Sequence, residues 1–68
     1  MSKLINDLVG KQCIIRSEFI FSFAGKTELS CKIIDADDEW IKICYTEKKD
    51  KQVVKLMRIE NIDSIEEQ

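Results

Sequence analysis

Apolar and polar residues alternate with a period of two along most of this chain, from Lys11 nearly to its end. In an extended strand this spacing places apolar side chains on one face and polar side chains on the other. Acidic or charged runs interrupt the alternation at residues 35–39 and 47–50, as expected of turns. The pattern therefore predicts antiparallel strands over about residues 11–23, 27–36, 40–46, 51–58 and 62–66.

The alternation also predicts which side chains form the core. In the first three strands the inward residues are Cys13, Ile15, Leu29, Cys31, Ile33, Ile41, Ile43 and Tyr45. In the last two strands the apolar residues are Val53 or Val54, Leu56, Met57, Ile62 and Ile65. Short, strongly bent antiparallel strands of this kind are expected to close into a small barrel, which removes free edges.

A short helix is predicted before the first strand, over residues 2–9. Ser2 is a good N-cap residue, and Gly10 suits the left-handed conformation that often ends a helix. The apolar residues of this segment share one helical face: Leu4, Ile5, Leu8 and Val9. A helix this short is not stable alone in water, so we expect it to dock this face on the rest of the chain.

Residues 18–26 allow two interpretations, an extension of the first strand or a loop. Phe19, Phe21 and Phe23 alternate, so in an extended segment they share one side, and residues 25–26 then form the turn. Three phenylalanines do not all fit easily inside so small a core. Either two of them pack under the N-terminal helix, or they form an exposed patch that another protein chain covers.

The chain has 68 residues, and residues 1–68 are expected to fold as one domain. A core of this size rarely supplies more than about 3–5 kcal/mol of stability. The three cysteines, Cys13, Cys31 and Cys44, include no C-x-x-C pair, and histidine is absent, so neither a disulfide framework nor a metal site is predicted. Self-association is the remaining support, and we expect a homo-oligomer.

The composition also argues against several functions. Without histidine the chain has no serine–histidine or cysteine–histidine pair, and its two glycines are isolated, so no phosphate-binding loop is present. Asp37 and Asp38 stand on a turn, where solvated carboxylates are poor general acids. We expect no enzyme activity, no cofactor and no small-molecule substrate. No apolar run reaches the about 18 residues of a membrane span, and no secretory signal opens the chain, which indicates the cytoplasm.

Two segments resemble the sequence motifs of the Sm-like family, which includes the Sm and Lsm proteins and the RNA chaperone Hfq. Residues 29–43 are similar to the first motif, in which an apolar strand ends in aspartate and a short polar turn restarts an apolar strand. Residues 56–65 are similar to the second motif, with Arg58 in the turn. The resemblance implies a mainly β fold: a short N-terminal helix, then a five-stranded, strongly bent antiparallel sheet that closes into a small Sm-like or SH3-type barrel.

Members of that family form rings in which the fourth strand of one subunit pairs with the fifth strand of the next, and they bind single-stranded RNA around the pore. The resemblance therefore implies a homo-oligomer that binds RNA. The implied RNA contacts are Asp35, Asp37, Asp38, Arg58 and Asn61, with Trp40 as a stacking platform. The protein-interface candidates are Phe19, Phe21, Phe23, Val53, Lys55, Met57, Ile62 and Ile65.

A second hypothesis is a protein-interaction or scaffolding barrel of the same fold that does not bind RNA. The turn at residues 37–39 is acidic, and an acidic turn repels phosphate. On this hypothesis Asp35 caps that turn and Trp40 anchors the edge of the core. Arg58 then pairs with Glu60 or with Asp35 instead of contacting a base.

Overall fold

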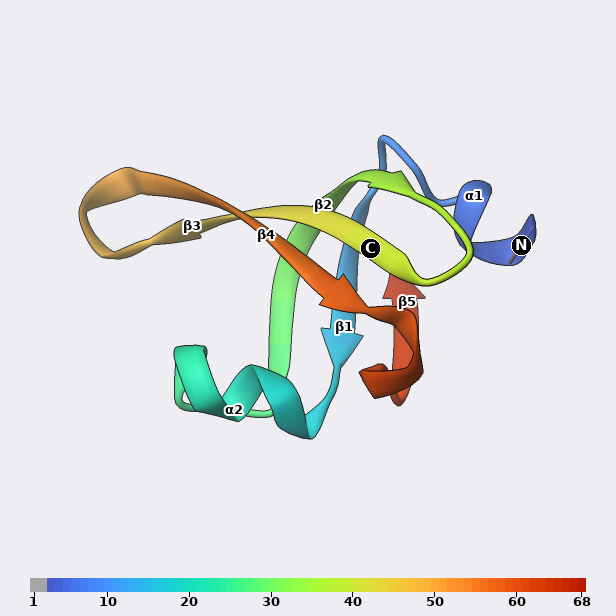
Figure 1. The fold of residues 1–68 in the computed structure, drawn as a ribbon. Helices are drawn as coiled ribbons and strands as arrows, with labels where there is room; N and C mark the ends of the chain where they lie inside the picture. The colour runs from blue at the N-terminus through green and yellow to red at the C-terminus, as the bar shows by residue number, and fades with distance from the viewer. Residues whose placement is uncertain (1–2) are drawn as a thin grey trace.

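The computed structural model describes residues 3–68 of the chain (Figure 1). Ser2, the expected N-cap of the first helix, lies outside the described residues. The elements, in chain order, are α1 (Lys3–Asn6), β1 (Gln12–Arg16), α2 (Glu18–Ala24), β2 (Glu28–Ala36), β3 (Trp40–Glu47), the 3-10 turn η1 (Lys48–Asp50), β4 (Lys51–Arg58), the 3-10 turn η2 (Ile59–Asn61) and β5 (Ser64–Glu67).

Within residues 3–68 the five strands form one antiparallel sheet with the order β4-β3-β2-β1-β5. This confirms the predicted mainly β architecture. The expected closure into a barrel is not present in the single chain, because β4 and β5 are the two edges of the sheet. The β3–β4 hairpin reaches beyond the rest of the sheet (Figure 1). None of the helices within this part of the chain has the length and apolar character to cross a membrane.

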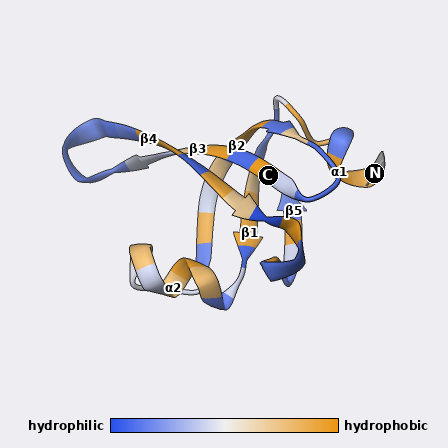
Figure 2. Cartoon of the chain, in the orientation of Figure 1, coloured by the Kyte–Doolittle hydropathy of each residue, from blue (hydrophilic) through white to orange (hydrophobic). Residues whose placement is uncertain are grey.

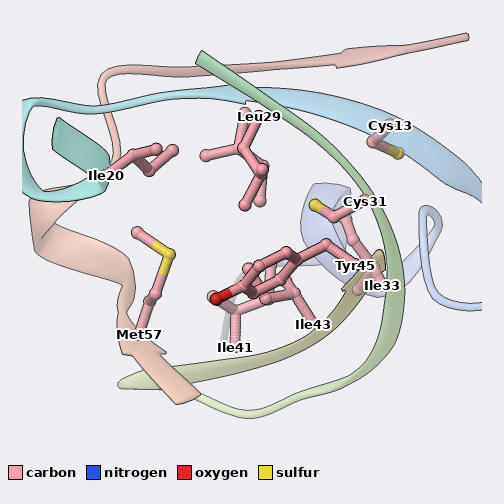
Figure 3. Packing of buried hydrophobic residues seen from close by; sticks show 10 residues of the cluster. Cys13, Ile20, Leu29, Cys31, Ile33, Ile41, Ile43, Tyr45 and Met57 are labelled. Carbon is pink, nitrogen blue, oxygen red and sulfur yellow. The ribbon is translucent and has the colours of Figure 1, made fainter. Parts of the chain in front are cut away.

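The core lies on the inner face of the bent sheet, where side chains from several strands converge (Figure 3). All the residues predicted to face inward on the first three strands are buried, which confirms that alternation. Figure 2 shows apolar and polar segments following one another along β1 and β2. Ile20 from α2 and Met57 from β4 complete the buried cluster.

The predicted first strand over residues 11–23 is wrong in its second half, because the chain leaves the sheet after Arg16 and forms α2. Two local signals make this helix. Ser17 has an extended backbone, and its hydroxyl oxygen accepts a hydrogen bond from the Phe19 N–H at 3.1 Å, which is the geometry of an N-cap. Gly25 ends the helix in the left-handed conformation (φ 74°), and its N–H donates to the Phe21 carbonyl at 3.2 Å.

The helix separates the three phenylalanines instead of aligning them. Phe19 and Phe23 are one turn apart and their rings meet edge-on, with centroids 5.8 Å apart. Phe23 also packs against the core, while Phe21 points away and is 63% exposed. The alternative in which two phenylalanines pack under the N-terminal helix is also wrong, since α1 packs on β2 at the other end of the molecule from α2 (Figure 1).

Within the described residues the N-terminal helix covers Lys3–Asn6, so it ends earlier than the predicted helix, which ran to residue 9. The chain then turns, and Gly10 and Lys11 pair with β2: the Gly10 N–H donates to the Ile33 carbonyl at 2.6 Å, and the Ile33 N–H donates to the Lys11 carbonyl at 3.1 Å. Gly10 has a φ of 87°, so its place after the helix fits the expected left-handed residue. Ile5, Leu8 and Val9 pack against the core, but Leu4 is 79% exposed.

The last two strands differ from the prediction in which side chains face inward. On β4 the inward residues are Val53 and Met57, whereas Val54 and Leu56 are 55% and 54% exposed. The register explains this, because buried Ile41 stands opposite Met57. The expected fifth strand over residues 62–66 instead covers Ser64–Glu67, because Ile62 caps η2 by donating its N–H to the Ile59 carbonyl at 3.0 Å, and the strand follows it.

Candidate interaction surfaces

The acidic turn between β2 and β3 is held by its own carboxylates. Asp37 Oδ1 accepts hydrogen bonds from the backbone N–H groups of Glu39 (2.9 Å) and Trp40 (2.8 Å). These bonds, the one from Trp40 first, lower the pKa of the Asp37 carboxyl group. Asp35 Oδ1 accepts a hydrogen bond from the Ala36 N–H at 2.9 Å. Asp35 and Asp37 therefore share the capping role that was expected of Asp35. Asp37 accepts two of the backbone hydrogen bonds of the turn, and Asp35 accepts one.

Arg58 lies at the end of β4, next to this turn. Its guanidinium forms ion pairs with Glu39 at 3.5 Å and with Glu60 at 3.4 Å. The pairing with Glu60 was expected, and Glu39 takes the place proposed for Asp35. The guanidinium carbon also lies 5.2 Å from the centroid of the Trp40 ring, within range of a cation–π interaction. The Nε atom of Arg58 is buried without a hydrogen-bond partner.

A shallow hollow of about 200 Å³ connects the turn to the outer face of the sheet. It is lined by Asp35, Ala36, Asp37, Trp40, Lys42 and Leu56. Lys42 stands opposite Leu56, and Cys44 stands opposite Val54, so these positions share the outer face of the β3–β4 pair. We call Trp40, Val54 and Leu56 the outer apolar patch; Trp40 is 40% exposed, and the other two are exposed as given above.

The structure brings together most of the RNA contacts implied by the sequence. Asp35, Asp37 and Trp40 line the hollow just described, and Asp38 and Arg58 line a neighbouring one with Glu39. Asn61 lies in η2, where its backbone carbonyl accepts a hydrogen bond from the Ser17 hydroxyl. This end of the molecule is acidic, and its arginine is already paired with carboxylates, so its electrostatics disfavour phosphate.

The two sheet edges contain the interface candidates of the last two strands. Met57 is buried in the core, and Val53, Ile62 and Ile65 are partly buried against it, so their side chains pack within the chain. Outward, the edges offer unpaired backbone groups, the exposed Val54 and Leu56 on β4, and charged side chains. Lys51 on β4 and Glu66 on β5 are exposed, whereas Lys55 lies over the Phe23 ring and Arg58 is paired as described above.

A groove between α2 and the β3–β4 hairpin was missed by the sequence interpretation. Its volume is about 530 Å³. It is lined by Phe23, Ala24, Lys26, Leu29, Tyr45, Thr46, Glu47 and Lys48. The groove exists because residues 18–24 are helical; the Ser17 and Gly25 caps were the local signal for that helix. Periodicity alone did not show it.

The three thiols are placed as core or near-core groups. Cys13 and Cys31 are buried and stand directly opposite each other on β1 and β2, and Cys44 is half-buried. Burial raises the pKa of the Cys31 thiol to about 12, and its neighbours Cys13 and Cys44 add to this shift. Burial also raises the pKa of Cys13. Within residues 3–68 no group of cysteine, aspartate or glutamate side chains is arranged to hold a metal ion.

No protein-family model matches the chain, and neither does any curated protein or solved structure. Its function is therefore inferred from the surfaces described above.

Proposed function

We propose that the protein is a non-catalytic, cytoplasmic scaffold of the Sm-like small-barrel type, in which the β4 edge of one copy pairs with the β5 edge of the next. The observation that carries this proposal is the pair of open edges with opposite charge. β4 presents the exposed Lys51 at its start, and β5 presents Glu66 and Glu67 at its end, where Glu67 also pairs with Lys11 at 3.7 Å. Antiparallel pairing of the two edges joins opposite charges and satisfies backbone groups that one chain leaves open.

Pairing of two different edges is a head-to-tail contact, so a row of copies keeps one open edge at each of its two ends until a ring closes. This is the assembly that the resemblance to the Sm-like family implies. The outer apolar patch supports the same conclusion. Its residues Val54 and Leu56 lie on the edge strand, and an edge that exposes large apolar side chains favours association.

The test is the native mass in solution, measured by size-exclusion chromatography with light scattering at micromolar protein. We expect a discrete assembly of about five to seven chains. Lys51→Glu and Glu66→Lys are each expected to lower the mass, because each places like charges across the contact. The double variant is expected to regain the assembly. Lys32→Glu, an exposed lysine in the middle of β2, is the matched control. A wild-type protein that stays monomeric contradicts the proposal.

A second candidate function is the binding of single-stranded RNA at Trp40 and Arg58. It is favoured by the exposed indole with a guanidinium beside it, because both groups stack on bases. The carboxylates of the turn repel phosphate, so we place this function second. Short oligo-U and oligo-A, followed by fluorescence anisotropy, test it. An RNA-binding protein loses affinity on Arg58→Ala and binds more weakly as salt rises, whereas a scaffold is indifferent to both.

A further inference from the structure

The groove between α2 and the β3–β4 hairpin is the largest hollow described above and has aromatic walls. Phe23 stands between Phe19 and Tyr45, with ring centroids 5.8 Å and 5.7 Å away. Tyr45 is nearly buried, and Leu29 adds an aliphatic side chain from β2. Its volume of about 530 Å³ is within the range of ligand-binding pockets. An apolar or aromatic side chain from outside the molecule therefore has a surface to pack against.

The rim of this groove is basic, although the chain as a whole has a net charge of −2. Lys26 and Lys48 line the groove, and Glu47 is the acidic residue among its lining side chains. Lys55 adds a third cation, with its Nζ atom 4.2 Å from the centroid of the Phe23 ring. The carboxylate-rich turn at residues 37–39 belongs to the opposite end of β3. The groove is thus a local positive site on an acidic molecule.

We propose that this groove docks an acidic peptide segment of a partner protein. One apolar or aromatic side chain of the partner packs against Phe23 and Tyr45. Carboxylates on either side of that anchor lie beside Lys26 and Lys48. This combination of a central apolar anchor and a charged rim is the usual anatomy of a protein-recognition site.

The observations favour a peptide over a nucleic acid. Single-stranded nucleic acids need a basic track that follows several phosphates, with a row of stacking rings. Here the lysines gather around one hollow, and Glu47 interrupts them. The lining residues of the groove lie in α2, the following loop, β2, β3 and the hairpin tip, so the site is separate from the β5 edge, and of the β4 edge only Lys55 reaches its rim.

The test uses the full chain and fluorescence anisotropy of a labelled, capped pentapeptide with phenylalanine between two pairs of glutamates. We expect saturable binding that weakens as salt rises from about 0.05 to 0.5 M. The variant with Lys26→Glu and Lys48→Glu is expected to lose about tenfold or more in affinity. A matched variant, with Lys32→Glu and Lys42→Glu on exposed sheet positions outside this groove, is expected to stay within about twofold. Replacing the central phenylalanine by alanine is expected to cost about tenfold.

Several outcomes overturn the proposal. One is the absence of saturable binding at millimolar peptide, and another is equal loss in the groove and control variants. A third is equal binding of a peptide with lysines in place of the glutamates. Tighter binding of oligo-U that the groove variant abolishes assigns the site to nucleic acid instead. The peptide is also titrated against Glu66→Lys, the β5 variant expected to weaken assembly; retained binding there separates this site from the proposed scaffold function.

Discussion

Trp40 and Arg58 stand opposite each other on β3 and β4, and the guanidinium carbon of Arg58 lies 5.2 Å from the centroid of the Trp40 ring. Trp40 is the single tryptophan of the chain, so its fluorescence reports this contact directly. The contact joins the acidic turn to the end of the edge strand, since Arg58 also pairs with Glu39.

Replacing Arg58 by alanine is expected to change the tryptophan emission and to lower the free energy of unfolding by about 0.5–1 kcal/mol. The effect is small because the Arg58 side chain is 41% exposed and its ion pairs are screened by water. Arg58→Lys keeps the charge and loses the planar group, so its free energy of unfolding is expected to lie between those of the wild type and Arg58→Ala. Urea unfolding followed by fluorescence measures both quantities, and an unchanged emission spectrum contradicts the contact.

Ser17→Ala is expected to destabilise the protein by about 2 kcal/mol. The Ser17 hydroxyl is buried, caps α2 by accepting from the Phe19 N–H, and donates to the Asn61 carbonyl. Its removal therefore takes a hydrogen-bond partner from the Phe19 N–H in α2 and from the Asn61 carbonyl in η2. The matched control is Ser22→Ala on the exposed part of the same helix, expected within about 0.5 kcal/mol of the wild type. Equal effects of the two substitutions on the denaturation midpoint would refute this role.

The acidic turn predicts a pH-dependent contribution to stability. The pKa of Asp37 is below its usual value of 3.8 in the folded protein, so its carboxylate stabilises the fold above that value. The contribution is lost as the pH falls through the lower, folded-state pKa. Asp37→Asn should therefore be less stable than the wild type at pH 7, and the gap should narrow between about pH 5 and pH 2. Asp63→Asn, at an exposed position after η2, serves as the control for the loss of one negative charge outside the turn.

The thiols are expected to differ in reactivity. A disulfide reagent at pH 8 should modify Cys44 in the folded protein, because Cys13 and Cys31 are buried and have raised pKa values. The other two should react only after unfolding in urea. Cys44→Ser should remove the early reaction and leave the later one. Early modification of more than one thiol would contradict the burial of this pair.

The strands were predictable because their apolar residues alternate over long stretches, as at Leu29, Cys31 and Ile33. Residues 18–24 were not, because Phe19, Phe21 and Phe23 alternate in the sequence whether the backbone is extended or helical. The segment is so rich in apolar residues that both periods fit it. The choice of helix over strand depends on Ser17 and Gly25, because their capping hydrogen bonds outweigh the strand preference of the phenylalanines.

The candidate surfaces were predictable where sequence neighbours form them, and at Arg58, which the resemblance to the Sm-like motifs placed with the acidic turn. The acidic turn and Trp40 are adjacent in the chain, so their proximity needed no tertiary information. The outward position of Leu56 depends on the register between β3 and β4, which the adjacent valines at 53 and 54 left open. The groove joins α2 to the far end of β3, and only the folded chain brings Phe23 beside Tyr45.

The position of β5 has a consequence for synthesis. β1 pairs with β2 on one side and with β5 on the other, and β5 is made after all the other strands of the sheet. During synthesis, the edge of β1 that pairs with β5 therefore stays unpaired after β2, β3 and β4 have been made. During this interval, β5 of a neighbouring nascent or finished copy can occupy that edge. When many copies are made close together, pairing of β5 with β1 of another copy, which is domain swapping, thus competes with pairing of β5 within its own chain.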